Sequence, residues 1–91
     1  MAYLPKNKLI YTVAVFEERG SGALDFRVSC SFVSMRDAID CLNKEAEYYE
    51  SKGYYPGENG WDDMQATKYV WQGLRGNDFV MIIASINPIV Q

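Results

Sequence analysis

The sequence predicts a small α+β domain in which one helix packs on an antiparallel sheet, in the order ββαββ. Two segments are apolar on both alternating faces, as central strands are, and a third alternates strictly between apolar and polar residues. A fourth segment has apolar residues at helical spacing. The chain has 91 residues, of which 48% are hydrophobic and 23% charged, so residues 1–91 are expected to form one domain.

The first half of the chain predicts a β-hairpin. Residues 9–16 are rich in β-branched and aromatic side chains, and the polar, glycine-containing residues 17–22 follow as a turn. Residues 23–32 have a period of two, which predicts a half-buried strand with its apolar side chains on one face. Those side chains are Leu24, Phe26, Val28, Cys30 and Phe32.

A helix is predicted over residues 34–52. Ser34 suits the N-cap, Asp37 suits the positive end of the helix dipole, and Gly53 follows Lys52 where a glycine commonly ends a helix. The apolar residues form one stripe that consists of Met35, Ala38, Ile39, Leu42, Ala46 and Tyr49.

The second half of the chain is less regular. Residues 53–60 predict a loop, with Pro56-Gly57 at a turn. Residues 61–76 give conflicting indications. Residues typical of helix ends stand near both ends of the segment, whereas residues 67–72 have the composition of a strand. We favour a strand over 67–72, with ββααβ as the alternative architecture. Residues 78–86 predict a central strand, because residues 79–84 are apolar on both faces, and Asn87-Pro88 ends it.

One helix is too narrow to cover such a sheet. Four strands span roughly 19 Å at their usual spacing, whereas a helix covers about 10–12 Å of one face. We expect the two doubly apolar strands in the middle and 23–32 and 67–72 at the edges. We expect the apolar second face to be covered by the aromatic loop 54–61 of the chain itself, by a second copy, as a homodimer through the open sheet face, or by a different protein.

The acidic residues cluster in the middle of the chain. Residues 37–63 contain eight acidic residues and two lysines, a net charge of −6, while the remaining residues carry +3. Aromatic residues accompany these acids after the helix. Such a surface suits a protein partner with a basic surface, because charge speeds encounter and aromatic side chains anchor the complex. The expected partner-binding residues are Glu47, Glu50, Tyr54, Tyr55, Glu58, Trp61, Asp62 and Asp63.

Several functional classes are disfavoured by composition. The chain has no histidine, and its two cysteines lack partners at zinc-site spacing, so we expect no catalytic residues, no metal and no cofactor. The sequence pI of 4.8 and the scattered lysines and arginines disfavour direct nucleic-acid binding. No signal peptide or long apolar run occurs, which predicts a cytoplasmic protein without membrane contact.

These observations predict a non-enzymatic protein-interaction module. In its small size, acidic charge and single domain, the chain resembles small accessory proteins of phages, such as anti-CRISPR inhibitors. The resemblance implies a partner among nucleic-acid-binding or defence complexes of a host, blocked at a basic groove. The alternative is a homodimer that binds or sequesters a small ligand such as a nucleotide. Its cleft would contain Tyr54, Tyr55, Trp61 and Trp71, with Arg75 or Arg36 on a phosphate.

Overall fold

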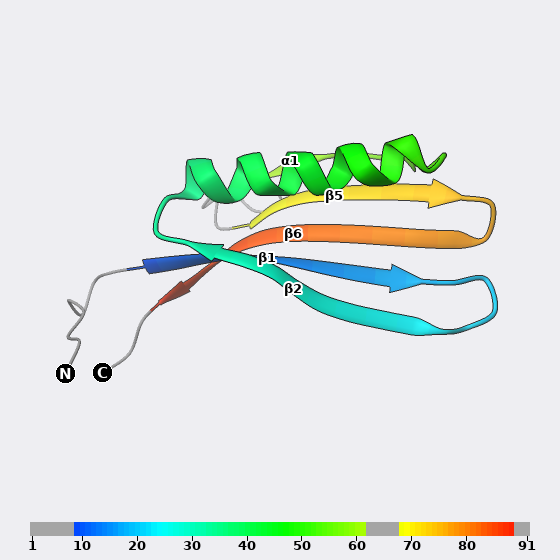
Figure 1. Cartoon of the computed structure of the whole chain (residues 1–91), viewed down its shortest axis with the longest axis horizontal. Coiled ribbons are helices and arrows are strands. Elements are labelled where there is room, and N and C mark those ends of the chain that lie inside the picture. Colours follow the sequence, from blue (N-terminus) through cyan, green and yellow to red (C-terminus); the bar gives the residue numbers. More distant parts are fainter. Residues whose placement is uncertain (1–8, 62–67, 89–91) are drawn as a thin grey trace.

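The chain forms an antiparallel sheet with a helix along one of its faces (Figure 1). The structure is a computed structural model, and it describes residues 9–61 and 68–88. Its elements are β1 (Leu9–Glu18), β2 (Leu24–Phe32), α1 (Met35–Ser51), β3 (Tyr55–Pro56), β4 (Gly60–Trp61), β5 (Lys68–Arg75) and β6 (Asp78–Pro88). The α+β class is confirmed. The order differs from ββαββ because two short strands, β3 and β4, lie in the segment that was predicted to be a loop.

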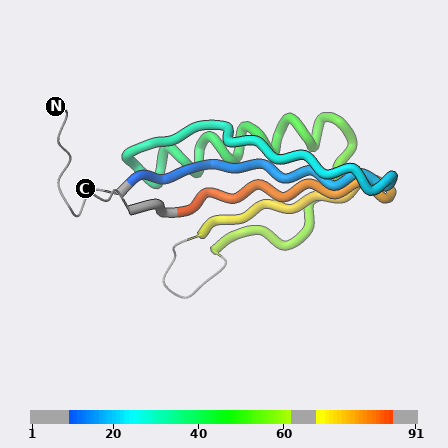
Figure 2. Tube along the Cα trace, turned by 90° about the horizontal axis from the view of Figure 1, so that it is seen from below, coloured from blue at the N-terminus to red at the C-terminus, as the bar shows by residue number. Residues whose placement is uncertain are grey.

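The strand order in the sheet is β2-β1-β6-β5-β3, and β4 also pairs with β5 (Figure 2). The two doubly apolar segments, β1 and β6, are neighbours in the middle, and β2 lies at an edge, as expected. The expectation that the fourth strand also lies at an edge was wrong, because β3 and β4 pair with β5 on its outer side. These short strands extend the sheet beyond its four long strands.

Residues 68–75 form strand β5, so the alternative of a second helix in this part of the chain was wrong. The strand-like composition of this segment, and not its residues typical of helix ends, indicated the correct structure. A strand buries Val70 and Trp71 on its two opposite sides. Arg75 and Asp78 pair across the tight turn to β6, where Gly76 takes the left-handed conformation with a φ of 60°. The first residue of the predicted strand, Thr67, lies outside the described residues.

Helix α1 begins and ends where its capping residues predict. The Ser34 side chain accepts a hydrogen bond of 3.4 Å from the backbone N–H of Asp37. At the other end, Gly53 has a φ of 95°, which lets the backbone N–H of Tyr54 donate to the carbonyl oxygen of Tyr49 at 3.1 Å. The predicted stripe supplies the buried residues of the helix, which are Ala38, Leu42, Ala46 and Tyr49.

The core lies between α1 and one face of the sheet. The strands contribute alternate residues to it, as a period of two requires. The buried strand residues on this face are Val13, Val15, Trp71, Val80, Ile82 and Ala84. Leu42 on the helix is fully buried among them. The stripe of α1 and the central strands therefore form one hydrophobic layer.

A β-bulge in β2 divides the apolar row that was predicted to share one face. Cys30 pairs with Val13 and Val28 pairs with Ala14, so Ser29 is an extra residue without a counterpart on β1. An extra residue reverses the alternation beyond it. Phe32 consequently packs against the core on the helix side, while Leu24, Phe26 and Val28 are exposed. The prediction of a single, half-buried apolar face was therefore wrong.

The sheet face away from α1 is largely uncovered by the described residues, although Val70 on this face is buried. We call it the open face. Its large exposed hydrophobic side chains are between 40% and 79% exposed, and they are Phe16, Leu24, Phe26, Val28, Tyr55 and Leu74. The partly exposed residues Phe79, Met81 and Ile83 of β6 lie on the same face. The expectation that no helix covers the second face is confirmed for the described residues.

Gly73 is expected to be intolerant of a side chain, although its strand position would normally favour alanine over glycine. A Cβ on Gly73 would lie 2.5 Å from a ring carbon of Trp71, which packs against Tyr49 in the core. Gly73→Ala should therefore lower the free energy of unfolding by about 1–3 kcal/mol, measured by urea denaturation. Gly57→Ala is the control, because its Cβ has ordinary contact distances. Equal stabilities of the two variants would contradict this packing.

Candidate functional site

Two grooves flank helix α1. The larger, of about 1050 Å³, lies between α1 and β2, and its lining includes Arg27, Lys44, Glu45 and Tyr48. The smaller, of about 360 Å³, lies between α1 and β5, and its lining includes Glu47, Glu50, Tyr69 and Trp71. Both grooves exist because one helix is narrower than the sheet beneath it. The two grooves differ in their acidic residues. Glu45 in the larger groove forms an ion pair with Arg27, whereas Glu47 and Glu50 in the smaller groove form none within the described chain.

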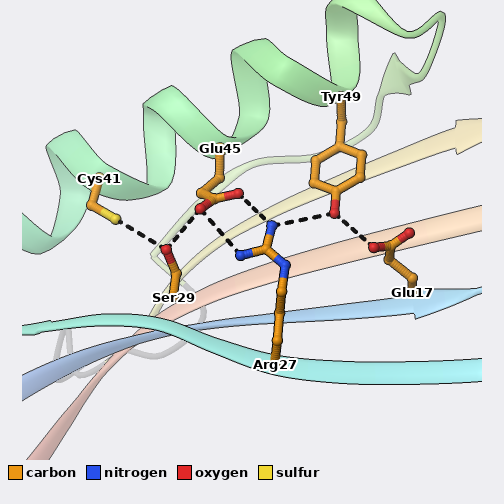
Figure 3. Close-up of polar contacts among 6 residues, drawn as sticks. All are labelled: Glu17, Arg27, Ser29, Cys41, Glu45 and Tyr49. Atoms are coloured by element: carbon orange, nitrogen blue, oxygen red, sulfur yellow. Dashed lines mark hydrogen bonds and ion pairs between the residues drawn. The ribbon is translucent and has the colours of Figure 1, made fainter.

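A network of hydrogen bonds crosses the larger groove and joins the strands to the helix (Figure 3). The Arg27 guanidinium donates to both carboxylate oxygens of Glu45, at 2.6 and 3.3 Å. The Ser29 hydroxyl donates to the same carboxylate at 2.7 Å. The Tyr49 hydroxyl donates to Glu17 at 2.8 Å. The bulge at Ser29 lets this hydroxyl and the Arg27 side chain both reach the helix.

The charges of this network are fixed at neutral pH. The Arg27 guanidinium and the Ser29 hydroxyl stabilise the carboxylate of Glu45 and hold its pKa below the ordinary value, against a smaller effect of burial. Glu45 in turn raises the pKa of Arg27. Burial raises the pKa of Tyr49 to about 12. Because these three groups change protonation far from pH 7, the network serves to fix β2 to α1 and is unsuited to proton transfer.

The smaller groove brings together part of the predicted partner-binding set. Glu47 and Glu50 on α1 line one side, while the aromatic rings of Tyr69 and Trp71 come from β5. Trp61 on β4 extends this aromatic surface, because its ring meets the Tyr69 ring edge-on at 5.1 Å between centroids. The result is a groove with carboxylates along the helix and aromatic side chains along the sheet.

The remaining predicted residues have separate positions. Tyr54 is buried, and the Arg75 guanidinium lies 4.6 Å from the centre of its ring. Tyr55 and Glu58 are exposed on the segment between α1 and β4, but they are not among the residues that line the smaller groove. Asp62 and Asp63 lie outside the described residues. The structure thus places Glu47, Glu50 and Trp61 together and Tyr54 in the core.

Some groove residues were missed from the sequence. Asn43 lines the smaller groove beside Glu47 and Glu50, and this spacing of four and three residues along α1 could have identified one flank of the helix. Asn59 contributes its side chain from the opposite side, where it also accepts a hydrogen bond from the Gln72 backbone N–H at 3.0 Å. No local pattern indicates that Tyr69 would join them, because its position depends on strand pairing.

The structure also limits the proposed ligand cleft. Trp71 and Tyr54 are both buried and pack on Tyr49, with ring centroids at 6.5 and 5.4 Å from it. Of the four aromatic residues expected in that cleft, only Tyr55 and Trp61 are exposed. Among residues 9–61 and 68–88 no group of three or more potential metal ligands lies together. No helix of the described chain has the length and apolar character to cross a membrane.

Comparison of the chain with protein-family models, with curated proteins and with solved structures found no match in any of the three. The functional argument therefore depends on the geometry and charge of this structure.

The Arg27–Glu45 ion pair makes stability depend on pH in a defined direction. A carboxylate whose pKa is lowered on folding stabilises the fold above its ordinary pKa of 4.5, and this contribution is lost as pH falls through the lowered value. Glu45→Gln should lower the unfolding free energy by about 1 kcal/mol at pH 7. The difference from the unmodified chain should shrink below pH 4.5.

The comparison needs urea denaturation at pH 7, 5 and 3. Glu47→Gln is the control, at an exposed position on the same helix that takes part in no ion pair among the described residues, and it should destabilise the chain much less than Glu45→Gln at pH 7. If Glu45→Gln destabilises the chain as much at pH 3 as at pH 7, the ion pair does not contribute as described.

Proposed function

We propose that this chain is a non-enzymatic protein-interaction module that docks an acidic, aromatic surface on a basic surface of a protein partner. The acidic surface is defined by Glu47, Glu50, Glu58 and Trp61, and Asp62 and Asp63 continue it in the sequence. Tyr55, which the sequence also predicted for this surface, pairs with Leu74 and so lies on the other face of the sheet. The observation that carries the proposal is the smaller groove, which exposed carboxylates of α1 and aromatic rings of β5 line together, with Trp61 of β4 in contact with Tyr69.

The charges of this surface are available to a partner. The ion pairs in the structure use Asp25, Glu45 and Asp78, and within the described chain neither Glu47 nor Glu50 takes part in one. An exposed carboxylate without a counter-ion attracts a basic surface at a distance, and it can form charge-assisted hydrogen bonds on contact. The groove therefore differs from the α1–β2 groove, whose Glu45 is already bound by Arg27.

The aromatic side chains give this surface a means of binding tightly. Trp61 is 48% exposed and supported by Tyr69, so it can insert into a partner without first reorganising. Charge then governs the rate of encounter, while the aromatic contact governs how slowly the complex dissociates.

A nucleic-acid-binding complex is the partner class that suits this surface best. Proteins that hold nucleic acid have grooves lined with lysine and arginine, and an acidic module can occupy such a groove in place of phosphates. The net charge of −6 over residues 37–63 supports this mode of action. We propose a small phage-type inhibitor of a host nucleic-acid-binding or defence complex, in the manner of anti-CRISPR proteins.

Charge reversal at the groove is the direct test. The partner is isolated by pull-down from a nuclease-treated bacterial lysate, purified, and its affinity for the chain measured by calorimetry at increasing salt. Glu47→Lys with Glu50→Lys should weaken binding at least tenfold, and the affinity of the unmodified chain should fall steeply with salt.

The control is Asp37→Lys with Asp40→Lys, which makes the same change in net charge on the same helix. Its folding is checked by circular dichroism, because Asp37 lies in the first turn of α1. The control should weaken binding much less than the groove variant. Equal losses, or affinity independent of salt, would contradict docking through the acidic surface.

A further inference from the structure

The open face of the sheet is a continuous apolar surface that crosses four strands. The register places Phe26, Phe16 and Met81 side by side on β2, β1 and β6. A second row runs through Val28, Ala14 and Ile83, whose next neighbour Val70 on β5 is buried, and on β5 the exposed surface continues at Leu74. The Phe16 and Phe26 rings are in contact, with 4.7 Å between their centroids. The exposed side chains therefore form one surface and are not scattered singly.

This surface is separate from the acidic one. Helix α1 lies on one side of the sheet (Figure 1). The two grooves flank the helix on that side, and the open face lies on the other. The described strands place only two charged residues on the open face, Glu18 and Lys68, both of which are exposed. A hydrophobic surface of this extent is typical of an interaction site.

We propose that the open face binds the open face of a second copy of this chain, forming a homodimer of two stacked sheets. Two twisted sheets pack well with their apolar faces together, about 10 Å apart. The helices then lie on the two outer sides of the dimer, where the acidic surfaces remain free for a partner.

The area of the open face is sufficient for a dimer. Four strands at the usual spacing, each exposing about 25 Å of its length, present roughly 450 Å² in projection. Side chains that protrude increase the accessible area, so that two copies together bury on the order of 1,000 Å² or more, the size expected of a specific interface. The same size indicates a dimer of moderate affinity, which dissociates on dilution.

The distribution of charge favours a second copy as the occupant. The chain carries a net charge of −3, and four of its exposed acids, Asp37, Asp40, Glu47 and Glu50, are on α1. Stacked open faces keep these acids on opposite sides of the dimer, which limits repulsion between the copies. A highly charged partner would have to bury its charges against an almost uncharged apolar face, which is costly.

The bulge in β2 is a second, independent argument. It allows Arg27, Ser29 and Phe32 to face the helix, while Leu24, Phe26 and Val28 face the other side. Three of the five residues in the most regular apolar alternation of the sequence are thereby directed away from the chain's own core. Such a strand would be unfavourable in an isolated monomer, because its apolar residues are exposed to water.

The test is sedimentation equilibrium of the full chain from about 1 µM to 500 µM. We expect a monomer–dimer equilibrium for the unmodified chain. Phe26→Glu should weaken the dimer at least tenfold, because it places a charge in the centre of the apolar interface. Tyr48→Glu is the matched control, since Tyr48 is 54% exposed on the helix side and Phe26 is 60% exposed on the open face. The control should leave the dimer unchanged.

A second variant distinguishes stacked faces from pairing of β2 edges. Leu74 lies on β5, at the far side of the open face from β2, and is 55% exposed. Leu74→Glu should also weaken the stacked dimer, whereas it would leave an edge-to-edge dimer intact. Circular dichroism of each variant checks that the fold is retained.

Three results would overturn the proposal. The first is a chain that stays monomeric at all concentrations, because residues of the same chain then cover the face. The second is a dimer that Phe26→Glu disrupts and Leu74→Glu does not. The third is a dimer that Tyr48→Glu disrupts as strongly as Phe26→Glu. None of these outcomes depends on Glu47 or Glu50, so the docking proposal is tested separately.

Discussion

The packing of one helix on one face of the sheet is the constraint on which the rest of the structure depends. Burial of apolar surface is the main stabilising contribution in a small domain, and here it is concentrated between α1 and the central strands β1 and β6. A helix covers a band narrower than this sheet. Grooves remain on both of its flanks, and the opposite face receives no cover from the described residues.

The two flanks of α1 illustrate two uses of acidic residues. On the β2 side, the Glu45 carboxylate is bound by Arg27 and Ser29, and this network holds the edge strand to the helix. On the β5 side, Glu47 and Glu50 border the groove without a counter-ion among the described residues. Position along the helix alone thus separates a carboxylate that stabilises the fold from carboxylates that can attract a partner.

The sequence was informative where local chemistry decides the structure. The caps at Ser34 and Gly53 and the apolar stripe of α1 indicated the helix, and the doubly apolar segments indicated the central strands. The bulge at Ser29 was not predictable, because it depends on which residue of β1 each residue of β2 pairs with. For the same reason the pattern suggested one apolar face for β2, where the structure has two.

The candidate site was predictable only in part. Composition indicated an acidic, aromatic surface and correctly selected Glu47 and Glu50 as exposed, but it could not show that Tyr54 is buried beneath Arg75. An aromatic residue after a helix can pack inward or outward, and the Gly53 turn decides this for Tyr54. Tyr69 joins the groove through the pairing of β5 with β6, and Trp61 reaches Tyr69 through the pairing of β4 with β5, which involves two residues of each strand.

The central claim is that residues 9–61 and 68–88 leave one face of their sheet largely uncovered. Oxidative footprinting by hydroxyl radicals, performed on dilute and on concentrated protein, measures this most directly. The account predicts that Phe16 and Phe26 react readily in dilute protein and become protected at high concentration, while Trp71 stays protected throughout. Protection of Phe16 and Phe26 at every concentration would show that the chain covers this face itself, and would contradict the account.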